Sequence, residues 1–87
     1  MIYMNSCYYD SLIDAILSLK SKKEARVFFD GILTSKERQE LPVRLQIVKL
    51  LKKGVPQHEI ASKLGVGVAT VTRGSKEIAK GNFSNWR

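Results

Sequence analysis

Residues 57–74, with the sequence QHEIASKLGVGVATVTRG, constrain the fold of this chain more than any other stretch. Ala61 is small at the point where two short crossed helices would approach most closely, and Gly65 can adopt the positive φ of a sharp turn. Apolar residues occur where such helices need inward-facing side chains, at Ile60, Leu64, Val66 and Val71. This pattern predicts a helix-turn-helix, a unit whose second helix enters the major groove of DNA.

The charge balance is compatible with a polyanionic partner. Fifteen Lys and Arg against eight Asp and Glu give the chain a net charge of +7. Charge alone leaves open a basic surface that only confers solubility. Paired helices also serve as protein-docking modules, so a helical protein-interaction module is the alternative function from another class.

Several functional classes are excluded by what the sequence lacks. Cys7 and His58 are the only residues of their types, which leaves no internal disulfide and no metal cluster. The sequence has no His–carboxylate pair at useful spacing, no nucleophile setting and no glycine-rich phosphate loop. No apolar run approaches the ~20 residues of a membrane span, and the first ten residues do not resemble a signal peptide. We therefore expect a cytoplasmic protein that is not an enzyme and needs neither a metal nor a cofactor.

The hydrophobic periodicity of the N-terminal half is helical. Apolar residues at 12, 13, 16 and 17 predict a helix over 11–19, with Asp10 as its N-cap. A second stripe at 25–33 follows the polar break SKKE at 21–24. Together these two helices show more apolar surface than one compact 87-residue unit readily covers. A homodimer would bury that surface and present two helix-turn-helix units to a two-fold symmetric DNA site.

A third helix begins with a capping box in which Thr34 and Glu37 satisfy each other's exposed amides, and it continues to Gly54. Pro42 inside this helix predicts a kink or a break near residues 38–42, because its ring crowds the preceding turn.

Shorter helices are expected over 57–63 and 68–80. The predicted fold is therefore all-α, with five to six short helices in one domain over 1–87. Its parts are scaffold helices at 10–54, a helix-turn-helix reading head at 57–80 and a tail at 81–87.

The DNA-contacting residues are expected at the starts of the two helices of the reading head. Ala and Thr side chains can contact thymine methyl groups, and Thr hydroxyls can bond bases or phosphates. Gln57 is well placed for a phosphate at a helix N-terminus, whereas His58 is interpreted as an exposed residue near the DNA backbone. Basic side chains at 63, 73, 76 and 80 are candidates for phosphate contacts, although many such residues are only solvated. The predicted DNA-binding set is Gln57, His58, Val68, Ala69, Thr70, Thr72 and Lys76.

Two segments resemble the bacterial tryptophan repressor family across about half of the chain. They are LTSKERQELPVRLQIVKLLKKG at 33–54 and QHEIASKLGVGVATVTRGSK at 57–76, and the strongest match is GVGVATVTRGS at 65–75. The resemblance implies an intertwined, all-helical homodimer that represses transcription at a double-stranded DNA operator. In the family's best-known branch, L-tryptophan is the corepressor. The N-terminal segment 12–34 resembles a shorter branch of small repressor-like proteins, whose ligands need not be tryptophan.

The resemblance also implies a ligand site between the scaffold and the recognition helix. Arg44 matches the arginine that packs along the indole, and Arg73 matches the arginine that meets the ligand carboxylate. Leu33 and Thr34 match residues that line the pocket from the other side, and Gly74 matches the glycine beside the indole. Without the resemblance, Arg44 would be interpreted as the partner of Glu40 or of the other subunit in a salt bridge.

The chain departs from the family pattern at several points. The linker before Gln57 is one residue shorter, and the family's last helix is expected to be missing or reduced. Glu77 stands where the family has a small hydroxyl residue near the ligand's amino group. Its carboxylate would either bind the ammonium or pair with Arg73 and occupy it. Trp86 is interpreted as a partly buried anchor or a disordered residue, with filling of the neighbouring pocket as a third option.

These departures leave two functional alternatives within the fold. The first is a tryptophan-responsive repressor, and the second is a regulator of the same fold with no ligand or a different ligand.

Overall fold

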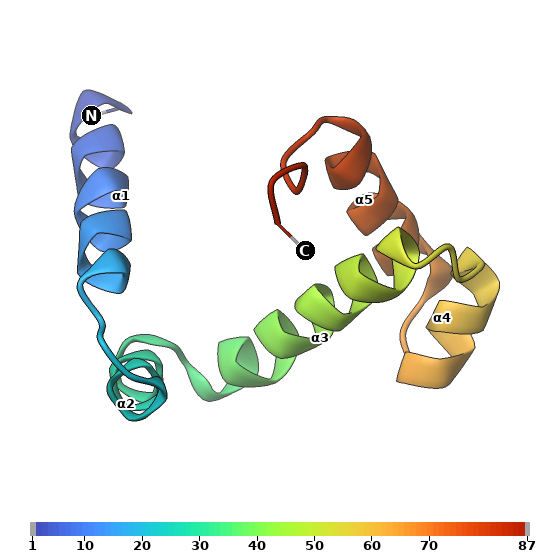
Figure 1. The fold of residues 1–87 in the computed structure, drawn as a ribbon, viewed down its shortest axis with the longest axis horizontal. Helices are drawn as coiled ribbons and strands as arrows, with labels where there is room; N and C mark the ends of the chain where they lie inside the picture. Colours follow the sequence, from blue (N-terminus) through green and yellow to red (C-terminus); the bar gives the residue numbers. More distant parts are fainter. Residues whose placement is uncertain (1, 87) are drawn as a thin grey trace. The chain divides into compact units, whose positions relative to one another are not determined.

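The computed structural model describes the backbone of residues 2–86 and the side chains of residues 7–86. Over this range it contains five α-helices and no strand, which confirms the all-α prediction (Figure 1). The helices are α1 (Ile2–Leu17), α2 (Lys22–Ile32), α3 (Ser35–Lys52), α4 (Gln57–Leu64) and α5 (Val68–Ala79).

The first helix is longer than predicted and differs at both ends. It begins at Ile2, so Asp10 lies inside the helix and its prediction as the N-cap is wrong. Residues 2–9 contain neither Gly nor Pro, so no residue in this stretch opposes extension of the helix toward the N-terminus. The helix ends at Leu17 rather than at residue 19, and the Ser18 hydroxyl donates to the Ala15 carbonyl at 2.6 Å just beyond that end.

The break between α1 and α2 lies at 18–21, earlier than the predicted 21–24, and residues 22–24 already belong to α2. Ser21 is the N-cap, and its hydroxyl accepts a hydrogen bond from the Glu24 amide at 3.0 Å. The Glu24 carboxylate in turn accepts from the Lys20 amide at 3.1 Å. The Glu24 amide in the first turn and the Lys20 amide just before the N-cap are therefore both satisfied, in an arrangement related to a capping box.

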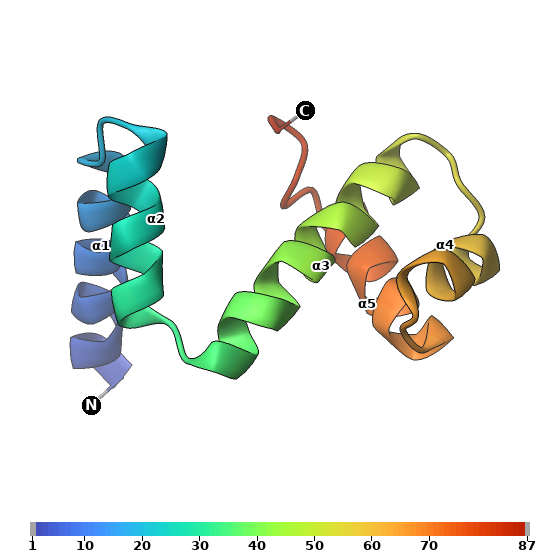
Figure 2. The ribbon, with the colours of Figure 1, turned by 90° about the horizontal axis from the view of Figure 1, so that it is seen from below.

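The chain forms two compact units that divide after Ser35. In the first unit, none of the side chains described at residues 7–35 is buried. The second unit contains α3, α4 and α5, so one of the predicted scaffold helices shares a unit with the reading head. Figure 2 shows α4 and α5 close to the C-terminal half of α3.

Helix α3 continues through Pro42 without interruption, so the predicted break is wrong. Pro42 itself is exposed, whereas the next residue, Val43, packs against the core. Apolar contacts on the buried face extend from Val43 to Leu51 and support the helix after the proline. The kink near residues 38–42 stays a prediction.

The hydrophobic core lies where α3, α4 and α5 meet. Its buried cluster comprises Ile47, Ile60, Ala61 and Val71, with Leu64 and Val66 partly buried against it. The inward orientation predicted for the helix-turn-helix residues is therefore confirmed. The turn is confirmed too, since Gly65 has φ +67° and the Val66 amide donates to the Ala61 carbonyl at 3.0 Å. A left-handed backbone at this position favours glycine because it has no Cβ.

Candidate functional site

The start of α5 presents an exposed surface next to the buried core. Val68, Ala69 and Thr70 form its first turn, and all three are exposed. Val68 keeps 51% of its surface accessible although it is a large apolar side chain. Val71, the next residue, is buried and holds this turn against α3 and α4. The predicted contact residues 68–70 are thus presented on a helix whose opposite face is fixed by the core.

A side-chain hydrogen bond joins the two helices of the reading head. The Thr72 hydroxyl donates to Oε1 of Gln57 at 2.7 Å, in a partly buried position. This bond leaves the Nε2 amide of Gln57 to donate elsewhere, at the start of α4. His58 and Lys76 are exposed. Thr72 therefore connects α5 to the predicted phosphate contact at Gln57.

A cleft of about 680 Å³ lies between α3, α5 and the chain that follows α5. It contains four of the predicted ligand-site residues, and it includes Thr70 from the predicted DNA-contact set. Its lining residues are Gln39, Glu40, Val43, Arg44, Ile47, Val48, Val66, Thr70, Arg73, Gly74, Glu77 and Phe83.

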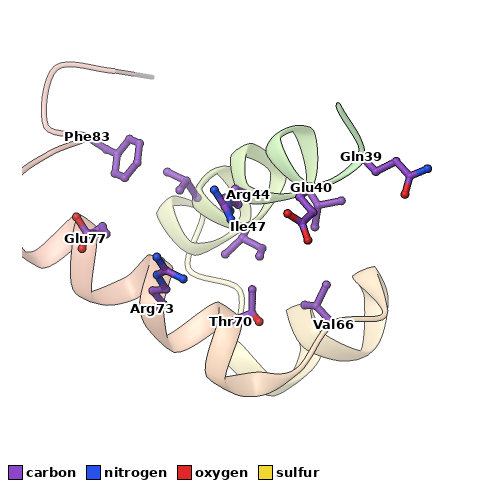
Figure 3. Close-up of a pocket in the computed structure, with 12 residues that line it drawn as sticks. Gln39, Glu40, Arg44, Ile47, Val66, Thr70, Arg73, Glu77 and Phe83 are labelled. Atoms are coloured by element: carbon purple, nitrogen blue, oxygen red, sulfur yellow. The ribbon is translucent and has the colours of Figure 1, made fainter. Parts of the chain in front are cut away.

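Two arginines reach this cleft from different helices. Figure 3 shows Arg44 on α3 and Arg73 on α5, on the two sides of the space between the helices. Within the side chains described, neither arginine takes part in an ion pair, so the predicted alternative of an Arg44–Glu40 salt bridge is not formed. Both guanidinium groups are therefore available to an anionic group in the cleft.

Glu77 is held by residues at the end of its own helix. Its carboxylate forms an ion pair with Lys80 at 3.0 Å and accepts a hydrogen bond from the side-chain amide of Asn82 at 2.7 Å. The hydrogen bond from Lys80, followed by the one from Asn82, holds the pKa of Glu77 below its usual value. The predicted alternative in which Glu77 pairs with Arg73 is wrong, because Lys80 and Asn82 lie closer to the carboxylate.

Gly74, on α5, packs against side chains of α3. A Cβ at this position would lie 3.0 Å from Cγ2 of Ile47 and 3.5 Å from Cδ1 of Leu51. Gly74 also lines the cleft, so its predicted place in the site agrees with the geometry. Its first physical role is to let the two helices pack closely.

Leu33 and Thr34 belong to the first compact unit, whereas the cleft is built from the second. Their part in a ligand site stays a prediction.

Several cleft residues were missed by the sequence analysis. Helical spacing from Arg44 would have found Glu40, Ile47 and Val48, because residues three or four apart share a face. Val43 shares a face with Ile47, four residues further along the helix. The same spacing from Arg73 reaches Thr70. No comparable signal exists for Phe83, which follows the last helix and enters the cleft only through the fold of the tail. Trp86 is half-buried, as expected of an anchor, and is not among the lining residues.

Comparison with known proteins gives a consistent result. Residues 8–85 match the family described as Trp repressor protein. The protein YerC of Bacillus subtilis strain 168 is 37% identical over 73 residues, which cover 84% of this chain and 70% of YerC. A Trp operon repressor homolog of Actinobacillus succinogenes is 37% identical over 78 residues, covering 88% of this chain and 77% of the homolog.

A Trp operon repressor homolog of Vibrio vulnificus strain YJ016 is 35% identical over 71 residues, covering 80% of this chain and 70% of the homolog. No solved structure matches the chain significantly. In the part of the chain that the structure describes, no helix is long and apolar enough to cross a bilayer.

Proposed function

The chain belongs to the Trp repressor family, a family of non-enzymatic regulators, and from that premise we propose that it is a DNA-binding transcriptional repressor. We propose further that it acts as a homodimer and that an amino acid, L-tryptophan in the first instance, binds in the cleft between α3 and α5. Each part of the proposal has its own support in the second compact unit or in the surface of the first.

DNA binding is supported chiefly by the reading head. The first turn of α5 exposes Val68, Ala69 and Thr70 while Val71 is buried beneath it. Val68 offers an apolar surface of the kind that contacts a thymine methyl group, and Thr70 offers a hydroxyl. Gln57 at the start of α4, oriented by Thr72, supplies a donor for a phosphate. The net charge of +7 favours association with the polyanion.

Dimerisation is supported by the first two helices. On α1, Tyr9, Ile13 and Leu17 recur at four-residue spacing, and the exposed fraction of Leu17 reaches 76%. Val27 and Ile32 add exposed apolar surface on α2. A run of exposed apolar side chains at helical spacing is typical of a protein interface, and a second copy of the chain is the partner that the family implies.

The charges of the cleft suit an α-amino acid. Arg44 and Arg73 supply cations for a carboxylate, and Arg44 also supplies a planar group that stacks on an aromatic ring. Glu77 lines the same cleft, forms no ion pair with Arg73, and has its carboxylate oxygens bound by Lys80 and Asn82. The carboxylate of an amino acid would therefore meet two cations in this cleft.

The position of Thr70 supplies a mechanism for ligand response. Thr70 belongs to the exposed first turn of α5 and also lines the cleft. A ligand in the cleft thus contacts the helix that carries the DNA-reading residues. It shifts the reading heads toward the DNA-competent arrangement only to the extent that it binds that arrangement more tightly.

The proposal is tested by titrating L-tryptophan calorimetrically into the free protein and into its complex with a duplex selected from a randomised library. We expect heat of binding in both and tighter binding in the complex, because linkage is reciprocal. Arg73→Ala should remove the heat, whereas Lys63→Ala, an exposed cation on α4 outside the cleft, should not. A protein that binds DNA but gives no heat with tryptophan, or still gives it after Arg73→Ala, would not use the proposed site. Either result favours a DNA-binding regulator of the same fold with no ligand or with a different ligand.

A further inference from the structure

The segment after α5 folds back onto α3. Nζ of Lys52, in the last turn of α3, donates hydrogen bonds to the carbonyl of Phe83, at 2.7 Å, and to the carbonyl of Trp86. The same ammonium lies 5.8 Å from the centroid of the Trp86 ring, within the range of a cation–π contact. One lysine therefore holds two carbonyls and one ring of the tail.

The two aromatic rings of the tail also contact each other. Their centroids are 6.4 Å apart, with an interplanar angle of 66°. Within this arrangement Trp86 faces Lys52, and Phe83 lines the cleft. Figure 3 shows Phe83 at the same end of the cleft as Glu77, whereas Gln39 and Glu40 lie toward the other end.

Resting on the proposed ligand role of this cleft, we propose that residues 81–86 form a latch that determines which ligands the cleft accepts. Lys52 is the positioning residue that holds the latch to α3. Phe83 is the specificity-determining residue, because its ring forms the end wall against which the ligand's side chain packs. An aromatic end wall favours a flat aromatic side chain, through edge or offset contacts between rings.

The volume of the cleft distinguishes an end wall from a plug. With Phe83 in place the cleft still has about 680 Å³, which lies within the usual range of roughly 300–1,000 Å³ for small-molecule sites. An amino acid therefore fits without displacing the ring. Removal of the Phe83 ring should lengthen the cleft and weaken the binding of a ligand that packs against this ring in the wild-type protein.

The latch itself is tested without any ligand. Trp86 is the only tryptophan of the chain, so protein fluorescence reports on it alone. Lys52→Met keeps the length of the side chain and removes the ammonium. We expect its emission to shift to longer wavelengths and its quenching by acrylamide to increase. Lys53→Met, at the neighbouring exposed lysine, is the matched control and should leave the spectrum unchanged. Unchanged emission in Lys52→Met overturns the latch.

The end wall is tested by calorimetric affinities for L-tryptophan and for the longer L-2-naphthylalanine. Phe83→Ala is expected to weaken the affinity for L-tryptophan roughly 10-fold and to shift the ratio of the two affinities in favour of L-2-naphthylalanine. Lys52→Met should shift the ratio in the same direction, and the matched control Lys53→Met should not. Circular dichroism and urea unfolding establish that each variant is folded.

The outcomes separate this inference from the proposed function. If wild-type protein binds L-tryptophan and Phe83→Ala leaves the ratio unchanged, Phe83 is not the end wall. If wild-type protein binds neither amino acid, the ligand part of the proposed function and the end-wall role fail together. The emission of Trp86 decides the latch in either case.

Discussion

At the scale of single residues, Gly74 determines how closely α5 approaches α3. The Cβ of an alanine at this position would lie 3.0 Å from Ile47, which is itself buried among Ile60 and Val71 and has little room to move. The family resemblance predicted a glycine beside a ligand. The tight helix contact depends on the three-dimensional packing of residues 27 positions apart, which sequence spacing does not reveal.

Gly74→Ala is expected to destabilise the protein. Overpacking of a well-packed core costs about 1–3 kcal/mol, whereas replacing Gly by Ala inside a helix gains up to about 1 kcal/mol. The net effect on the free energy of unfolding should be a loss on the order of 1 kcal/mol, measured by urea denaturation. Gly31→Ala is the matched control, since Gly31 lies in α2 with no atom within 4 Å of the added Cβ. Equal or increased stability in Gly74→Ala would show that the Ile47 side chain moves to accommodate the added methyl group.

Glu77 should titrate below the usual range of a glutamate. Its hydrogen bonds from Lys80 and then Asn82 lower its pKa in the folded protein. Stability from this group is therefore present above the pKa of the unfolded chain and is lost as pH falls through the folded pKa. We expect a carboxyl carbon titration by NMR to place the pKa of Glu77 below the usual value of a glutamate. Lys80→Met should raise the pKa toward its usual value, and no rise would contradict the assignment of its cause.

At the scale of elements, the sequence predicted the reading head better than the first two helices. Gly65 and the apolar residues from Ile60 to Val71 carry local and tertiary signals that agree, so the boundaries of α4 and α5 fall within one residue of the prediction. The start of α1 has no breaker and no clear apolar stripe. The start of α2 is marked by Ser21 and Glu24, a signal present in the sequence but interpreted as a polar break.

The cleft was predictable only in part, because one of its lining residues depends on a contact between segments distant in the sequence. Arg44, Arg73, Gly74 and Glu77 follow from the family pattern, and their neighbours on the same helix faces follow from helical spacing. Phe83 depends on how the tail returns to α3 through Lys52, a contact between residues 31 positions apart. No periodicity extends across α4, α5 and their connections, which separate the two residues.

The bond between Gln57 and Thr72 should couple the two helices of the reading head. Thr72→Val removes the hydroxyl with little change in shape, and Gln57→Ala removes its acceptor. In a double-mutant cycle we expect a coupling free energy of about 0.5–1.5 kcal/mol by urea denaturation. Thr72→Val should also weaken DNA binding, because it frees the side chain of Gln57. Additive effects of the two substitutions would show that the bond contributes nothing.

At the scale of the whole molecule, the first compact unit has no buried side chain among residues 7–35, although it carries several large apolar ones. Burial of these side chains would stabilise an assembly by about 25 cal/mol per Å² of apolar surface, before the cost of association. A second copy of the chain is therefore expected to contribute to the stability of this unit.

Leu17→Glu should dissociate the homodimer. A charge at this exposed apolar position would be buried without a partner in the interface. Sedimentation equilibrium is expected to give a dimer for wild-type protein and a concentration-dependent shift to monomer for the variant. Ser11→Glu, a change to the same residue elsewhere on α1, is the control that should remain dimeric. A monomeric wild-type protein at micromolar concentration would contradict the proposal.

The proposed reading of duplex DNA by the first turn of α5 is measured by fluorescence anisotropy with a selected duplex over a series of salt concentrations. We expect the logarithm of the association constant for DNA to fall linearly with the logarithm of the salt concentration. Val68→Glu should abolish specific binding, whereas Gln46→Glu, which makes the same change of charge at an exposed position of α3, should reduce it only slightly. Absence of binding to any duplex at low salt, or equal binding by Val68→Glu and Gln46→Glu, would show that the first turn of α5 does not read DNA.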